Sequence, residues 1–260
     1  MPRAMVLATA LAAAGFAQWE NEAVVISPGF AVEGQTIKGA PYQAQAVTSV
    51  KQTLATGSEI STQITALVAR DAEGRTRREQ TLRSIGPWSL PLEPRSRESP
   101  TVILIQDPVK QVNITLDPRT HIARMNRQRT VSQLEELRRR ENARREEAVR
   151  REPRQERTES LGKMKIEGLM AEGRRTTTTF PPGSVGNTAA IEIVVVTWVS
   201  TDLHVVVLGK RSDPRVGDMT YRLISIQRGD PPASLFEVPA EYRVETEEER
   251  RLNERERPRK

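Results

Sequence analysis

The sequence predicts an α+β fold that is mostly antiparallel β and carries one charged helical insertion. Short segments of alternating apolar and polar residues, separated by Gly, Pro and Asp turns, make up most of the chain, and one tract of Arg and Glu interrupts them. From Leu203 to Val244, strand, turn, strand, turn and closing strand follow one another without a helix. Alternation with a period of two is typical of half-buried antiparallel strands.

The first half of the chain alternates clearly. Residues 55–58 suit a hairpin loop, and Gly74 accepts the positive backbone angle that the next turn needs. Asp107 and Asp117 each precede a proline and open further turns. We expect strands at residues 42–54, 60–68, 75–82, 101–105 and 112–116.

The second half contains strands that are apolar on both faces. Residues 191–199 and 203–208 have this pattern, which indicates a strand covered on both sides. Core packing explains it, and so does a binding cavity. We expect strands at 161–166, 173–180, 191–199, 203–208 and 219–226. The candidate cavity residues are Val194, Val196, Trp198, Val206 and Leu208.

The charged tract covers residues 124–158, with twelve Arg, seven Glu and therefore a net charge of +5. Glu and Arg recur four apart, as in Glu136 with Arg140, a spacing that supports a solvated helix. The tract predicts a solvated arm, or a contact for an envelope protein or anionic lipid headgroups. Its interspersed Glu argues against nucleic-acid binding. Candidate partner-binding residues are Arg138, Arg139, Arg140, Arg144 and Arg145.

The start of the chain predicts an exported protein. Residues 1–17 have one Arg, an apolar run and a small-residue site, the pattern of a signal peptide, and the chain has no cysteine. A periplasmic or secreted location is therefore expected. The predicted organisation is a lead segment over 18–40, a single β-sheet domain over 41–244 and a disordered charged tail over 245–260.

Catalytic chemistry is not indicated. His121 and His204 are far apart and lack a second ligand at helical or hairpin spacing, and no nucleophile or phosphate-loop motif occurs. Asp213 beside Arg211 and Arg215 forms an ionic group, which ordinary turn chemistry also explains. We assign no catalytic, metal or cofactor site and expect no enzyme; a hydrolase is the weakest of the hypotheses.

Several segments resemble a known group. They are LDPRT at 116–120, IEGLMAEGRRT at 166–176, TWVSTDL at 197–203, KRSDPRVGDMTYRL at 210–223 and LFEVPAEY at 235–242. Together they resemble secreted bacterial proteins distantly similar to the periplasmic lipoprotein-carrier (LolA-like) and envelope-stress-regulator (RseB-like) half-barrels. The resemblance implies a strongly curved half-barrel sheet whose concave face holds a hydrophobic cavity, closed by helices in the carriers and used for acyl chains.

Two functions follow as expectations. The first is an exported, non-catalytic binding or carrier module for an apolar ligand, a lipid or an acylated protein, in the cell envelope. The alternative is an envelope sensor or protein-interaction module that uses the charged helix.

Overall fold

The computed structural model describes residues 36–81, 101–129 and 152–246, with residue 249 and some residues between 133 and 147. The predicted signal peptide and most of the lead segment and tail lie outside the described residues. So do many residues in the middle of the charged tract, between 130 and 151, and the helical insertion stays a prediction.

The described strands form one open sheet of 12 strands in the order β12-β6-β5-β4-β3-β2-β1-β11-β10-β9-β8-β7. The first six are β1 (Tyr42–Thr53), β2 (Glu59–Arg70), β3 (Thr76–Thr81), β4 (Thr101–Asp107), β5 (Val112–Asp117) and β6 (Ile122–Arg127). The others are β7 (Gln155–Ile166), β8 (Leu169–Phe180), β9 (Ile191–Ser200), β10 (Val206–Asp213), β11 (Gly217–Arg228) and β12 (Arg243–Glu245). Neighbours pair antiparallel except β12 with β6. The predicted mostly antiparallel sheet is confirmed.

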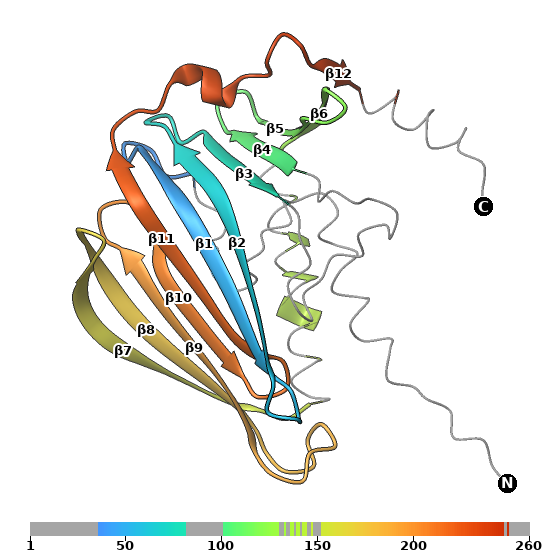
Figure 1. Cartoon of the computed structure of the whole chain (residues 1–260), viewed down its shortest axis with the longest axis vertical. Helices are drawn as coiled ribbons and strands as arrows, with labels where there is room; N and C mark the ends of the chain where they lie inside the picture. The colour runs from blue at the N-terminus through green and yellow to red at the C-terminus, as the bar shows by residue number, and fades with distance from the viewer. Residues whose placement is uncertain are drawn as a thin grey trace, which may run out of the picture.

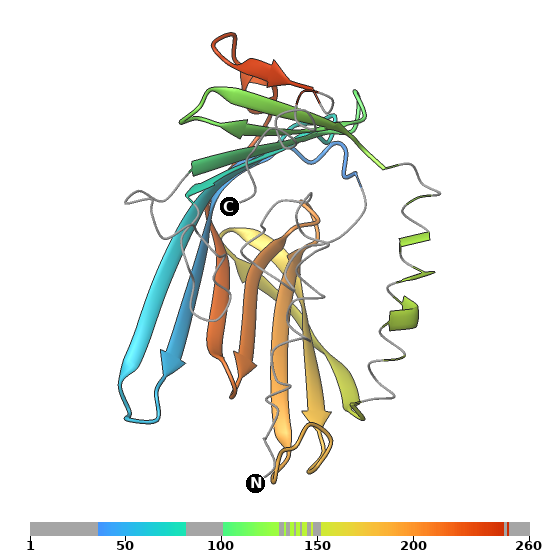
Figure 2. The same ribbon diagram turned by 90° about the vertical axis from the view of Figure 1, so that its right-hand side faces the viewer.

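The sheet consists of two meanders, β1–β6 and β7–β11, which the β1–β11 pair joins. The long strands run steeply, and β4–β6 cross above their upper end, so that the sheet is strongly curved (Figure 1 and Figure 2). β6 lies near one edge and β7 forms the other. The chain between them, residues 128–154, therefore has to pass from one side of the sheet to the other.

The charged tract is shorter than predicted, because strands occupy both of its ends. Residues 124–127 belong to β6, and residues 155–158 belong to β7. The strand predicted at 161–166 is the second half of β7; the first half was missed because β7 is an edge strand that is solvated on both faces, so it alternates little. The predicted closing strand is β12, but its pairing with β6 was not predicted because it joins segments remote in sequence.

The segment from Leu203 differs from the prediction at two places. Leu203 lies in a turn, where its backbone N–H donates to Ser200 Oγ (3.1 Å), and the strand begins at Val206. A short 3₁₀ helix, η2 (Ala233–Phe236), interrupts the segment predicted to lack helices. It follows two prolines, Pro231 and Pro232, which prevent the strand from continuing.

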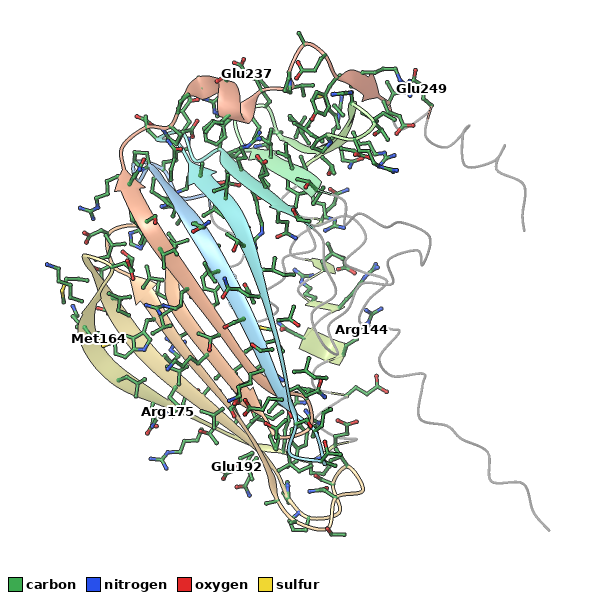
Figure 3. The ribbon with its side chains drawn as sticks, in the orientation of Figure 1. Arg144, Met164, Arg175, Glu192, Glu237 and Glu249 are labelled. Carbon is green, nitrogen blue, oxygen red and sulfur yellow. The ribbon has the colours of Figure 1, made fainter. Side chains whose placement is uncertain are left out.

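The curvature defines an inner (concave) and an outer (convex) face. Figure 3 shows Arg175 and Glu192 pointing out from the convex side, whereas Arg144 lies on the other side of the sheet. Because side chains alternate along a strand and paired residues share a face, strand register extends this assignment across the sheet. Outer-face Val196 pairs with Arg175, and inner-face Val195 pairs with Arg211.

The C-terminal segment covers the outer face of β3–β6. Phe236 of η2 is 1% exposed and packs in a cluster with buried residues of β4, β5 and β6. The guanidinium of Arg75 lies 5.2 Å from the Phe236 ring centroid and forms an ion pair with Asp71 (2.5 Å). The contact between Arg75 and Phe236 therefore attaches the C-terminal segment to the β2–β3 turn. The apolar members of the cluster are Ala69, Ile103, Ile105, Ile114, Leu116 and Ala123.

Asp-Pro dipeptides shape three turns, as the sequence predicts for two of them and allows for the third. Asp107 Oδ1 accepts from the backbone N–H groups of Val109 (2.9 Å) and Lys110 (2.8 Å), and Asp117 does the same in its turn. In the β10–β11 turn, the Asp213 carboxylate accepts from the backbone and side chain of Arg215 and from Arg211 (3.3 Å).

We predict that Asp213 makes stability fall in acid. Burial would raise the pKa of the Asp213 carboxyl, but the hydrogen bonds and charge of Arg215, with the charge of Arg211, outweigh burial and lower it below 3.8. Its stabilisation is therefore complete above the unfolded-state pKa of about 3.9 and disappears as the pH falls through the lower folded-state pKa. In urea unfolding between pH 7 and pH 2, the wild type should lose its advantage over Asp213→Asn below about pH 4.

The matched control is Asp117→Asn, since among the described residues that carboxylate accepts only from the backbone N–H groups of Arg119 and Thr120 and from no arginine side chain. A stability difference between wild type and Asp213→Asn that is the same at every pH would contradict the prediction.

Candidate ligand site on the inner face of the sheet

The inner face of the long central strands is mostly apolar, with three alanines near its centre. Alternate residues of β1, β2 and β11 point to this side, and register brings them together: Ala46 pairs with Ala66 on one side and Leu223 on the other. We refer to this set as the alanine floor. Its members are Ala44, Ala46, Val50, Ile64, Ala66, Met219 and Leu223, all 7% exposed or less.

Partly buried apolar side chains extend the floor toward β3 and β4. Val68 on β2 and Val102 and Leu104 on β4 share the inner face and are only partly buried. Apart from the contacts between paired strands, the described elements pack on one another mainly where η2 meets β3 and β4. This contact is on the outer face. No described helix or strand forms a second layer over the inner face.

Arg70 is a structural arginine at the upper end of this face. It is 6% exposed, and its Nε (3.0 Å) and Nη2 (2.8 Å) both donate to the carbonyl oxygen of Ala40. Nη2 also donates to the carbonyl oxygen of Leu203, and the guanidinium lies 5.0 Å from the Tyr42 ring centroid. Burial lowers the pKa of Arg70. The side chain thus joins the start of the domain to the β9–β10 turn.

Arg78 lies in an apolar row on the same face. Its cross-strand partners are Val68 on β2 and Leu104 on β4, and Val68 in turn pairs with Ala44. Its Nε donates to Gln80 Oε1 (2.6 Å). Burial lowers the pKa of Arg78, and Tyr221 and Tyr42 act electrostatically in the opposite direction. Among the described residues, Arg78 has no carboxylate within ion-pair distance.

Two tyrosines complete the site. Burial raises the pKa of Tyr221 to about 12, with Tyr42 adding to the shift and Arg78 opposing it. Burial also raises the pKa of Tyr42, against the charges of Arg70 and Arg78. Both phenols therefore keep their protons at neutral pH. The inner face presents hydroxyl and guanidinium groups beside aliphatic side chains.

Acidic side chains are distributed unequally between the faces. By register, every carboxylate in β1–β4 and β11 belongs to an outer-face position, whereas Arg70 and Arg78 belong to inner-face positions. The outer-face acids of these strands are Glu59, Glu79, Asp107 and Asp218. The central inner face therefore carries positive charge without a compensating carboxylate from its own strands.

The predicted cavity residues lie elsewhere and do not form one group. Val194, Val196 and Trp198 alternate with each other on the outer face, the face of Glu192, and Leu208 pairs with Trp198. A bulge between Val206 and Leu208 places Val206 opposite Val199, which belongs to the inner face. The predicted grouping of Val206 with the others is corrected, since a period-two pattern does not reveal a bulge.

Trp198 packs against glycine rather than lining an opening. It is 8% exposed, and a Cβ built on its cross-strand partner Gly173 would lie 2.7 Å from the indole ring. The tryptophan therefore lies on the bare backbone of β8, which is the reason for a glycine within that strand.

Some of the predicted partner-binding arginines are described. Arg139, Arg140 and Arg144 are exposed, whereas Arg138 and Arg145 lie outside the described residues. Arg140 Nε pairs with Glu136 Oε1 at 2.8 Å, which confirms that predicted four-residue pairing. Figure 3 places Arg144 on the inner side of the sheet.

Other candidate chemistry is limited. In the part of the chain that the structure describes, no three His, Cys, Asp or Glu side chains gather as metal ligands. Within the same part, no helix is long and apolar enough to cross a membrane. His121 and His204 are exposed, and His121 stacks edge-on with Tyr242 at 5.4 Å between ring centroids. On the outer face, a shallow hollow of about 300 Å³ is lined mainly by Thr and Gln, with Leu67 and Glu79.

Sequence reasoning missed the inner-face residues Tyr42, Arg70, Arg78 and Tyr221. A signal was present, because Arg70 continues the same alternate positions as Ile64, Ala66 and Val68. A charged residue at an inward position of an alternating strand indicates either a buried hydrogen-bond network or a ligand contact.

Comparisons with known proteins find distant structural similarity only. No protein-family profile and no curated protein matches the sequence. A chain in the MucA/MucB complex of Pseudomonas aeruginosa is similar, with 11% identity, a TM-score of 0.38, and coverage of 80% of this chain and 59% of that chain. LppX from Mycobacterium tuberculosis has 15% identity and a TM-score of 0.29, with 77% and 91% covered.

A LolA superfamily protein from Nitrosomonas europaea is also similar, with 8% identity, a TM-score of 0.30, and coverage of 76% of this chain and 90% of that one. The predicted distant similarity to the LolA-like group is confirmed. The chain spans about three fifths of the matched chains in the two MucB structures (59% and 60%). Because these similarities are distant, what this protein binds has to be inferred from its own residues.

We predict that Gly173→Ala destabilises the fold through Trp198. The added methyl group meets the indole ring, and overpacking of this kind costs about 1–3 kcal/mol. Urea unfolding followed by tryptophan fluorescence measures the loss. The double variant Gly173→Ala/Trp198→Leu is the control: its loss should be smaller than the sum of the two single losses, because the clash is shared. Strictly additive losses would contradict this packing.

Proposed function

We propose that this protein is an exported, non-catalytic binding or carrier module of the cell envelope. Its ligand is apolar, a lipid or an acylated protein, and its acyl chain lies along the inner face of the curved sheet. Export places the module in the periplasm or outside the cell, as the pattern of residues 1–17 suggests.

One observation carries the proposal: the apolar inner-face side chains of Val68, Val102 and Leu104 are only partly buried, and no described secondary-structure element packs on them. The outer face of β3–β6, which is similarly apolar, is covered by η2 and the C-terminal segment. Apolar side chains that stay partly exposed on a curved sheet suit an apolar ligand. The alanine floor beside them is 7% exposed or less and is therefore already covered.

The alternative function is an envelope sensor or protein-interaction module. Topology supports it, because residues 128–154 connect β6 to β7 at opposite sides of the sheet, and Arg144 lies on the inner side. The exposed arginines Arg139, Arg140 and Arg144 would then contact a protein partner or anionic lipid headgroups.

Leu104→Asp tests the ligand site. Leu104 is only partly buried on the inner face, so a carboxylate there should leave the domain folded while removing an acyl chain from its surroundings. Native mass spectrometry of protein purified gently after export should show a co-purifying acyl species on the wild type and its loss on the variant. Val109→Asp, at a position 57% exposed in the β4–β5 turn, is the matched control. Equal ligand occupancy in all three proteins would exclude this site.

Replacement of residues 130–150 with a flexible Gly/Ser linker separates the two functions. If the protein is a carrier, the co-purifying acyl species should persist, because the inner-face side chains are unchanged. If it is an interaction module, the acyl species is irrelevant and partners recovered by cross-linking in the envelope should disappear. Loss of acyl capture with retained cross-links would reverse the assignment.

A further inference from the structure

We propose that Arg78 binds the carboxylate of a single-chain fatty acid, whose hydrocarbon chain runs over the partly buried side chains of Val68, Val102 and Leu104. The inference deepens the proposed function, on which it rests, by assigning the ligand class and the residue that selects it.

The first step concerns the hydrogen bonds of the Arg78 guanidinium. Arginine carries five N–H donors, and in Arg78 only Nε has a described hydrogen bond, to Gln80 Oε1 at 2.6 Å. Arg70, on the same face, uses its guanidinium on the carbonyls of Ala40 and Leu203. A cation in apolar surroundings is costly unless it is paired. The two terminal nitrogens of Arg78 thus form one edge suited to two carboxylate oxygens.

The second step concerns the side chains around the two terminal nitrogens of Arg78. Val68 and Leu104 flank Arg78 across the strands, and Ala44 follows Val68 in the same row. All four acids of β1–β4 and β11 occupy outer-face positions, so no neighbouring strand supplies a carboxylate to this face. Burial lowers the pKa of Arg78, which agrees with a charge that its own strands leave uncompensated. A cation beside an aliphatic surface matches an amphiphile with an anionic end.

The third step selects the headgroup. A carboxylate carries one negative charge and two oxygens in one plane, which one guanidinium edge satisfies. A phosphate monoester carries more charge and more acceptor oxygens, and it normally needs additional donors. The donors of the nearby Arg70 are already used on carbonyl oxygens. The site therefore fits a fatty acid better than an alkyl phosphate.

The test compares three ligands with the same number of carbon atoms on the delipidated protein: palmitate, hexadecanol and hexadecyl phosphate. Each competes with a neutral lipophilic fluorescent dye, which reports the affinity. The wild type should bind palmitate about 10- to 100-fold more tightly than hexadecanol, the range expected for charge-assisted hydrogen bonds. Arg78→Met should bind palmitate no more tightly than hexadecanol, with the hexadecanol affinity changed less than about threefold.

Arg222→Met is the matched control. Arg222 is on the outer face of β11, pairs with Val47 and is exposed, so the variant loses the same charge and should keep wild-type selectivity. Arg70→Met provides a second comparison, because Arg70 holds two carbonyls and its loss should lower the thermal midpoint. Arg78→Met should lower it much less, since Arg78 makes one described hydrogen bond, to Gln80, and no ion pair among the described residues.

Four outcomes are decisive. Unchanged palmitate selectivity in Arg78→Met overturns the inference while leaving the proposed function intact. A lowered thermal midpoint in Arg78→Met, equal to that of Arg70→Met, assigns Arg78 a structural role and also overturns it. Tighter, Arg78-dependent binding of hexadecyl phosphate than of palmitate overturns the choice of headgroup. Failure of the dye, palmitate and hexadecanol all to bind the wild type removes the proposed function itself.

Discussion

A single curved sheet has two faces to cover and few other elements to cover them with, and the rest of this structure depends on that constraint. The sheet is covered differently over β3–β6 and over the central strands. Over β3–β6 the chain returns after β11 and lays η2 and the following residues on the outer face. Over the central strands the alanine floor is buried, whereas Val68, Val102 and Leu104 beside it are only partly buried.

The same constraint explains where the charges lie. A strand with alternating faces can place all its acids on one side, and β1–β4 and β11 place theirs on the outer face. The two inner-face arginines then have different roles because of their hydrogen bonds. Arg70 joins the chain start to the β9–β10 turn through carbonyl oxygens, whereas Arg78 keeps its terminal nitrogens uncommitted among aliphatic side chains. Arg70 therefore holds two parts of the chain together, whereas Arg78 is the group that we propose to bind the ligand.

The outer face has its own packing beyond the ligand question. Trp198 was the obvious aromatic candidate for a cavity, yet it rests on Gly173 and is almost fully buried. A large aromatic side chain over a strand glycine is a way to fill an outer face without a helix. The apolar pattern of β9 therefore has two causes. On the outer face Trp198 packs on Gly173, and on the inner face Val195 and Val199 belong to the apolar side of the sheet.

The sequence by itself determined the class of fold, because period-two alternation and Asp-Pro turns are local signals. It placed most strands to within a few residues, the hairpin loop at 55–58 and the Asp107 and Asp117 turns. It also identified the charged tract, because amino-acid composition is read directly from the sequence.

Only the tertiary structure decided which strand faces share a side, because that depends on pairing between segments far apart and on bulges. The bulge at Val206 separated it from Trp198, and the β6–β12 pair joined residues more than a hundred positions apart. Register between β1, β2, β3 and β4 placed Arg78 in an apolar row with Ala44, Val68 and Leu104. No local pattern contains that information, since a side chain acquires its chemical surroundings from neighbours that only the folded sheet brings to it.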